Sequence, residues 1–228
     1  MRRISGLIFD LDGTITLTQQ FHYQAFSQVF AAHGITYTED DDLYKYAGMG
    51  SGVIFPKVFA DHGITLTDEQ ILEYSHEKKE IYDQIIHSQK IEPVVGVADF
   101  LERMHGRGYR MGIASGNKPE SIEFLLSAVG VRAYFEFILS GSDVHKPKPA
   151  PDIYLAAAEK LGLFPSECVV FEDAVNGIQG AEAAGMMSIG IATRTAEMLL
   201  RAAGADIVVK DYDELDDVMI DEVLGGGI

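Results

Sequence analysis

Two aspartates separated by one residue, Asp10 and Asp12, are the clearest candidates for chemistry in this chain. They follow the apolar run 7–9 and precede Gly13 and Thr14, a pattern typical of a short buried strand that ends in a turn. Side chains two residues apart on a strand point the same way, so both negative charges would share a small volume. A hard divalent cation would offset this repulsion. Mg²⁺ is the first ion to consider, because it binds one or two carboxylates together with water and phosphate oxygens.

A hydroxyl and small residues follow a second apolar run. The run 111–114 ends in Ser115, Gly116 and Asn117, just before a predicted helix. The N-terminus of a helix favours anions, so this segment predicts a seat for a phosphate group. Ser and Asn are also ordinary N-cap residues, which is the structural alternative.

Two lysines and a second acidic pair follow the next two runs. Lys146 and Lys148 alternate with prolines, which fix an extended backbone and restrict where each ammonium points. One of them could face the site, and a solvated helix entry is the alternative. Glu172 and Asp173 end the run 169–171 and could complete an oxygen shell for Mg²⁺, although acidic residues before a helix also complement its dipole. Four strand ends with matching chemistry are more specific than any one of them.

The order of elements predicts an α/β fold, a Rossmann-like parallel sheet with helices on both faces. Strands are expected at 110–114, 137–139, 168–171, 187–191 and 206–209, and helices at 97–105, 119–129, 151–161, 176–184 and 195–203. The first strand belongs to this sheet, so the α/β core domain comprises residues 1–15 and 90–228. Residues 16–89, with apolar residues at helical spacing, are an inserted helical cap domain that we expect to act as a lid over the aspartates.

Composition limits the partners. The chain has 18 Lys and Arg against 35 Asp and Glu, a formal charge of -17, so we expect no binding to nucleic acid or to an anionic membrane. No apolar run approaches the ~20 residues that span a bilayer. The single cysteine, Cys168, lies in an apolar run and is expected to be a buried thiol. Without a secretory signal, the expected location is cytoplasmic.

Four motifs carry a resemblance to a known family. They are Asp-Leu-Asp-Gly-Thr at 10–14, Ser-Gly-Asn at 115–117, Lys-Pro-Ala-Pro-Asp at 148–152 and Phe-Glu-Asp-Ala-Val-Asn-Gly at 171–177. In this order, and with a helical insert after the first, they resemble the haloacid dehalogenase superfamily in its phosphatase and phosphomutase branch with a small helical cap. The resemblance covers essentially the whole chain.

The family's chemistry implies distinct roles for the motif residues. Asp10 would be the nucleophile that becomes an aspartyl phosphate, and Asp12 the general acid and then the general base. Lys148 is preferred to Lys146 because its register matches the family's motif. The implied Mg²⁺ ligands are Asp10, the Asp12 backbone carbonyl, Asp173 and Glu172, the last directly or through water. The implied phosphate-binding residues are Gly13, Thr14, Ser115, Gly116, Asn117 and Lys148.

The predicted function is a Mg²⁺-dependent phosphatase acting on a small phosphorylated metabolite, with a sugar phosphate favoured because a small cap encloses little more. The alternative is a phosphomutase similar to beta-phosphoglucomutase, which holds a second phosphate with a cap Arg. The corresponding loop 48–52 has no Arg, and Thr14 stands where the mutase usually has Val, so hydrolysis is favoured. Lys45 or Lys57 could replace the Arg.

Two further alternatives remain at this point. A non-catalytic binding protein or a receiver-like signalling module could also display acidic strand ends, but a receiver is about half as long and lacks the helical insert.

His22 matches a cap position that is often His in this branch, so it is a candidate for the site near Asp12, and a packed or surface histidine is the other interpretation. We expect a monomer or a small homo-oligomer.

Overall fold

The computed structural model describes residues 4–46 and 49–225. The chain divides into two compact units, an α/β unit of residues 1–17 with 91–228 and a helical unit of residues 18–90. These boundaries fall one or two residues after those expected from the sequence. Gly48, the first residue of the loop 48–52 that was compared with the mutase, lies outside the described residues.

The α/β unit is built on one six-stranded parallel sheet with the strand order β3-β2-β1-β4-β5-β6. The strands are β1 (Gly6–Phe9), β2 (Arg110–Ser115), β3 (Phe137–Ser140), β4 (Cys168–Glu172), β5 (Met187–Ile191) and β6 (Ile207–Val209). All residues of β1 and β4 are buried, as expected for central strands of a sheet that is covered on both faces. The predicted α/β fold class is confirmed.

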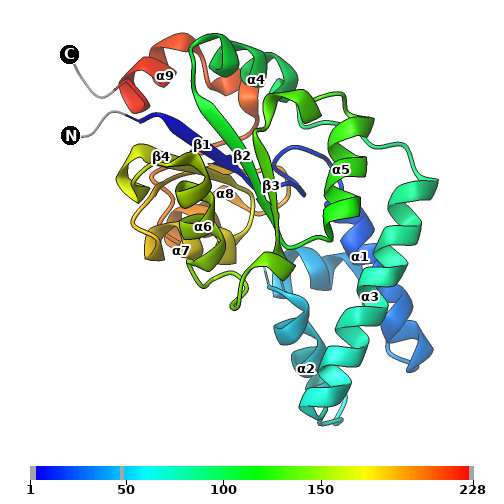
Figure 1. The fold of residues 1–228 in the computed structure, drawn as a ribbon. Coiled ribbons are helices and arrows are strands. Elements are labelled where there is room, and N and C mark those ends of the chain that lie inside the picture. The colour runs from blue at the N-terminus through cyan, green and yellow to red at the C-terminus, as the bar shows by residue number, and fades with distance from the viewer. Residues whose placement is uncertain (1–3, 47–48, 226–228) are drawn as a thin grey trace. The chain divides into compact units, whose positions relative to one another are not determined.

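Helices cover the two faces of this sheet. They are α4 (Val97–Gly106), α5 (Pro119–Ala128), α6 (Asp152–Leu161), α7 (Val175–Ala183), α8 (Glu197–Ala202) and α9 (Asp217–Val223). Figure 1 shows α6 and α7 on one side of the sheet and α4 and α5 on the other. The predicted bounds of α4 to α8 each differ from these by one or two residues at an end; in α6, Pro151 is the N-cap rather than the first helical residue.

Aromatic side chains form the core on one face of the sheet. The ring of Phe9 stacks on Phe171, with centroids 4.5 Å apart, and meets Phe100 edge to face. Phe100 in turn packs against Tyr212, 4.9 Å between centroids. Ile8 points to the opposite face, where it packs with α6, because side chains alternate along a strand. The core therefore holds β1 rigidly from both sides.

The helical unit contains α1 (Gln19–Ala32), α2 (Ser51–Asp61), α3 (Asp68–Ser88) and a short π-helix at Asp41–Lys45. Its core is aromatic, and includes Phe26, Phe30, Phe55 and Phe59. A capping box between Thr67 and Gln70 fixes the start of α3. Within the described ranges, no helix combines the length and the apolar content needed to cross a bilayer.

Removing the Phe100 ring should destabilise the protein strongly. Phe100 is fully buried and contacts three other aromatic rings, so Phe100→Ala is expected to lower the free energy of unfolding by about 3–5 kcal/mol. Met198 of α8 is 74% exposed, so Met198→Ala is expected to change it by less than about 0.5 kcal/mol. Urea unfolding of both variants measures the difference, and equal effects would contradict this packing.

Candidate active site

Asp10 and Asp12 lie just beyond the carboxyl end of β1, in the middle of the sheet. β1 pairs with β2 on one side and β4 on the other, so the strand order reverses at this point, where open α/β sheets bind ligands. The Asp10 backbone amide donates to the Phe171 carbonyl of β4 at 3.0 Å, which ties the start of the loop to the sheet. Both aspartates are largely buried, with exposed fractions of 9% and 8%.

Lys148 lies in the loop before α6, and its side chain contacts the ends of β1, β2 and β4. Its Nζ donates to Asp10 Oδ1 at 2.6 Å, to Glu172 Oε1 at 2.7 Å and to the Ala114 carbonyl at 3.0 Å. These three acceptors use all three N–H donors of an ammonium group. Lys146, the other candidate lysine, is exposed. Lys148 is therefore the lysine that links three strand ends.

Burial and charge act on these groups in opposite directions. Burial raises the pKa of Asp10 to about 7, although Lys148 lowers it, and Glu172 and Asp12 add to the rise. For Lys148, burial lowers the pKa, but the carboxylates of Asp10 and Glu172 outweigh it and hold the pKa well above its ordinary value. Lys148 therefore stays a cation, and the surrounding carboxylates outnumber it.

The acidic groups of β1 and β4 fit a divalent cation. Asp10, Glu172 and Asp173 each offer a carboxylate oxygen, and these oxygens all lie within 4.8 Å of one another. Asp12 adds a fourth carboxylate to the same strand end, against one ammonium. Such an excess of buried negative charge, supplied entirely by hard oxygen donors, suits Mg²⁺.

Asn117 links Asp12, after β1, to Ser115, at the end of β2. Its Nδ2 donates to Asp12 Oδ2 at 2.6 Å, and its backbone amide donates to Ser115 Oγ at 3.2 Å. Ser140, at the end of β3, donates from its hydroxyl to the Asn117 carbonyl at 2.7 Å. Ser140, which binds the loop 115–117 through this hydrogen bond, is not evident from the sequence. The amide of Asn117 orients the Asp12 carboxylate.

Three other residues predicted to contact phosphate, Gly13, Thr14 and Gly116, have different surroundings. Gly13 adopts φ 78°, its amide donates to the Thr16 carbonyl at 2.7 Å, and its carbonyl accepts from Thr193 Oγ1 at 2.8 Å. Thr14 is fully buried, and its hydroxyl makes no hydrogen bond within residues 4–46 and 49–225. Gly116, by contrast, has open space where a Cβ would stand. Gly13 thus shapes the loop, and Thr193 is a second support that the sequence did not reveal.

His22 lies on α1 of the helical unit, and its ring stacks on Tyr82 with centroids 4.1 Å apart. The ammonium of Lys78, on α3, donates to His22 Nδ1 and lies over the rings of Phe26 and Tyr82. Lys78 is only 6% exposed. The sequence does not reveal this buried lysine, because nothing in a helical run distinguishes it from surface lysines.

The two cap lysines that the sequence suggested have other contacts. Lys45 forms an ion pair with Asp61 at 2.5 Å, on the surface of the helical unit. The ammonium of Lys57 lies 3.6 Å from the sulfur of Met49. Lys78, not Lys45 or Lys57, is therefore the buried one of these three cations.

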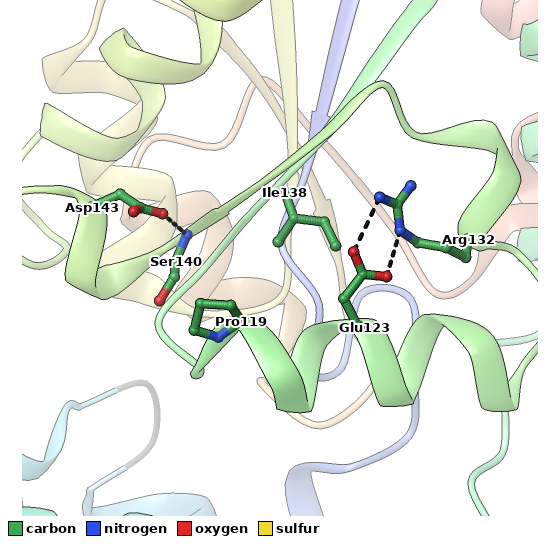
Figure 2. A pocket seen from close by; sticks show the side chains of 6 residues that line it. All are labelled: Pro119, Glu123, Arg132, Ile138, Ser140 and Asp143. Carbon is green, nitrogen blue, oxygen red and sulfur yellow. Dashed lines mark hydrogen bonds and ion pairs between the residues drawn. The ribbon is translucent and has the colours of Figure 1, made fainter.

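A separate pocket lies beside α5 and β3 (Figure 2). In it, Glu123 accepts from Nε and Nη2 of Arg132, at 2.7 and 3.1 Å, and so binds the guanidinium with both of its oxygens. Asp143 accepts from the backbone amide of Ser140 at 2.8 Å. Glu123 and Arg132 thus pair with each other, and Asp143 binds the backbone at the end of β3.

Known proteins are similar to this chain in sequence and in fold. Residues 7–191 match the family described as haloacid dehalogenase-like hydrolase. Protein CbbY of Rhodobacter capsulatus is 34% identical over 188 residues, covering 80% of this chain and 83% of that protein. The fructose-1-phosphate phosphatase YqaB of Escherichia coli (strain K12) is 33% identical over 189 residues, covering 83% and 97%. A solved beta-phosphoglucomutase from Clostridium difficile is similar with a TM-score of 0.80, at 25% identity and 96% coverage of both chains.

The chain belongs to the haloacid dehalogenase-like hydrolase family. Within that family it falls, as predicted, in the branch of phosphatases and beta-phosphoglucomutase. The prediction of an enzyme that hydrolyses phosphoric monoesters is confirmed by the family and by relatives that are phosphatases.

Gly177→Ala should displace the Glu172 carboxylate and destabilise the protein. A Cβ at this position of α7 would lie 1.8 Å from Glu172 Oε1, and that carboxylate is held by Lys148. We expect a loss of about 1–3 kcal/mol in the free energy of unfolding, because the buried carboxylate cannot move without leaving its partners. Gly106→Ala in α4 is the matched control, since its Cβ would meet no atom within 4 Å. Chemical denaturation that gave equal values for the two variants would refute this account of Gly177.

Mg²⁺ should stabilise the protein through the acidic cluster. Millimolar Mg²⁺ is expected to raise the unfolding temperature above that in EDTA, because a ligand that binds the folded state stabilises it. Asp173→Asn should remove most of this shift. Asp221→Asn, which changes an exposed carboxylate on α9, should retain it. Differential scanning calorimetry makes the measurement, and an equal shift in both variants would place the cation elsewhere.

Proposed function

We propose that the protein is a Mg²⁺-dependent phosphatase that hydrolyses a small phosphomonoester, and that a phosphorylated sugar is the favoured substrate. The observation that carries the proposal is the contact of Lys148 Nζ with Asp10 Oδ1, 2.6 Å, at the reversal point of the sheet. A carboxylate placed beside a permanent cation can approach an anionic phosphoryl group that it would otherwise repel.

Asp10 is the proposed nucleophile. Its free carboxylate oxygen forms a bond to phosphorus while the ester P–O bond breaks, which gives an aspartyl phosphate and the alcohol. Water then attacks phosphorus, the bond to Asp10 breaks, and inorganic phosphate leaves. Ser115 and Lys148 are the proposed contacts of the phosphoryl oxygens, since a hydroxyl and an ammonium both donate to them.

Asp12 is the proposed acid and base. In the first step it gives its proton to the departing alcohol oxygen, and in the second it takes a proton from the attacking water. The hydrogen bond from Asn117 Nδ2 to Asp12 Oδ2 supports this role, because it fixes the direction in which the carboxyl group points. Orientation of the carboxyl group is thereby set before the substrate arrives.

Asp10, Asp173 and Glu172 are the proposed side-chain ligands of Mg²⁺, with the Asp12 backbone carbonyl. Glu172 Oε1 already accepts from Lys148 and Tyr154, so Glu172 has less capacity for a metal than Asp10 or Asp173. When bound, Mg²⁺ would neutralise charge on the transferring phosphoryl group.

Support for a sugar phosphate comes from the relatives, among them the fructose-1-phosphate phosphatase at 33% identity. We propose that the helical unit supplies the specificity. Its acidic and basic groups, including the His22–Lys78 pair, are the first to test. A cytoplasmic location and a monomeric or small homo-oligomeric state stay predictions.

A phosphomutase is the second candidate, because the solved beta-phosphoglucomutase shares the fold over 96% of both chains. The absence of an Arg from the sequence of loop 48–52 favours hydrolysis over transfer to a second sugar position. A mutase must also protect its phosphorylated intermediate from water.

Phosphate release tests the proposal. With Mg²⁺, the wild type is expected to release phosphate from at least one of fructose 1-phosphate, glucose 1-phosphate, glucose 6-phosphate and p-nitrophenyl phosphate. Asp10→Asn should fall to background, because an amide is a poor nucleophile. Equal release by both proteins would exclude this mechanism. Interconversion of glucose 1- and 6-phosphate in the presence of a bisphosphate primer would identify the mutase instead.

A further inference from the structure

Tyr154 of α6 lies outside the four motifs, yet it reaches the centre of the site. Its side chain is fully buried, and its hydroxyl donates to Glu172 Oε1 at 3.0 Å. The same oxygen accepts from Lys148 Nζ at 2.7 Å. The phenol is the donor in this hydrogen bond, because a carboxylate oxygen only accepts.

Tyr154 also contacts the lysine directly. The ammonium of Lys148 lies 5.0 Å from the centre of the Tyr154 ring, within the range of a cation–π contact. The second oxygen of Glu172 accepts from the Ala174 amide at 2.9 Å. Tyr154 therefore contacts both members of the Lys148–Glu172 ion pair, one with its ring and the other with its hydroxyl.

Helix α7 leaves room for this arrangement. A Cβ at Gly177 would collide with the Glu172 carboxylate, and one at Gly180 would lie 3.1 Å from Tyr154 Cε2. Residues three apart share one face of a helix, so these two glycines form a continuous recess under Glu172 and Tyr154. Both side chains therefore pack against α7 at positions where that helix has no Cβ.

We infer that Tyr154 is a positioning residue that holds Glu172, and through it Lys148, at the point where the ammonium meets the phosphoryl oxygens. This inference rests on the proposed phosphatase function. To contact a phosphoryl group, Lys148 must exchange one of its three acceptors for a phosphate oxygen. Glu172, fixed by the Tyr154 hydroxyl and the Ala174 amide, keeps the ammonium in place during that exchange.

Tyr154→Phe tests the role of the hydroxyl, because it keeps the ring, its packing and its contact with Lys148. With Mg²⁺ and either p-nitrophenyl phosphate or fructose 1-phosphate, we expect kcat/KM to fall about tenfold, the size of one lost hydrogen bond to a charged group. Part of the fall should be a rise in KM, since a displaced lysine binds the phosphate less well. KM does not depend on the fraction of folded enzyme, so a merely structural defect would leave it unchanged.

Tyr134→Phe is the matched control. Tyr134 lies in the same unit and packs against His105, so loss of its hydroxyl should leave kcat and KM at wild-type values. A second comparison uses Lys148→Ala: adding Tyr154→Phe to it should cause no further loss, because residues that act through one group are not additive.

Three results are decisive. If Tyr154→Phe matches the wild type and Tyr134→Phe in both KM and kcat, the inference is overturned. The same holds if Tyr154→Phe lowers kcat/KM equally with and without Lys148, since the tyrosine would then act independently of it. If the wild type itself hydrolyses neither substrate nor any other phosphomonoester in the panel, the proposed function fails, and the inference that rests on it fails too.

Discussion

The buried ammonium of Lys148 is the interaction on which the site depends. It lies between two carboxylates, Asp10 and Glu172, from different strands, and its third donor takes a strand carbonyl. One positive charge does not balance four acidic groups, and the pKa of Asp10 is raised to about 7 by burial in spite of Lys148. In a chain of formal charge -17, the proposed function assigns the binding of an anionic substrate to this lysine and to the proposed Mg²⁺ together.

Residues outside the motifs hold the candidate site residues in place. Thr193 binds the Gly13 carbonyl, Ser140 binds the Asn117 carbonyl, and Tyr154 binds Glu172. Each is a hydroxyl from a different part of the chain that binds the site at or just beyond the end of one strand. The arrangement is consistent with preorganisation, in which polar groups are oriented before the substrate binds and cost little reorganisation afterwards.

The sequence predicts the sheet well, because buried runs bounded by glycine and polar residues leave little ambiguity for β1 and β4. It also predicts that Asp10, Lys148 and Glu172 lie together at the carboxyl ends of the strands, since parallel strands end on the same side of a sheet. It could not reveal Tyr154, Ser140 or Thr193. In the sequence these are ordinary helix, strand-end and loop residues, and only tertiary packing places their hydroxyls against the site. The start of α6 was misplaced by one residue because Pro151 suits either the N-cap or the first helical position.

The central claim is that Asp10 carries the phosphoryl group, and acid quenching during turnover tests it most directly. The protein would be mixed with Mg²⁺ and a phosphomonoester that it hydrolyses, quenched in acid, digested and mapped by mass spectrometry. The account predicts one phosphoryl group on the peptide that contains Asp10, removed by hydroxylamine as expected for an acyl phosphate. A phosphoryl group on Ser115 or on any other residue would contradict it, as would undiminished turnover by Asp10→Asn.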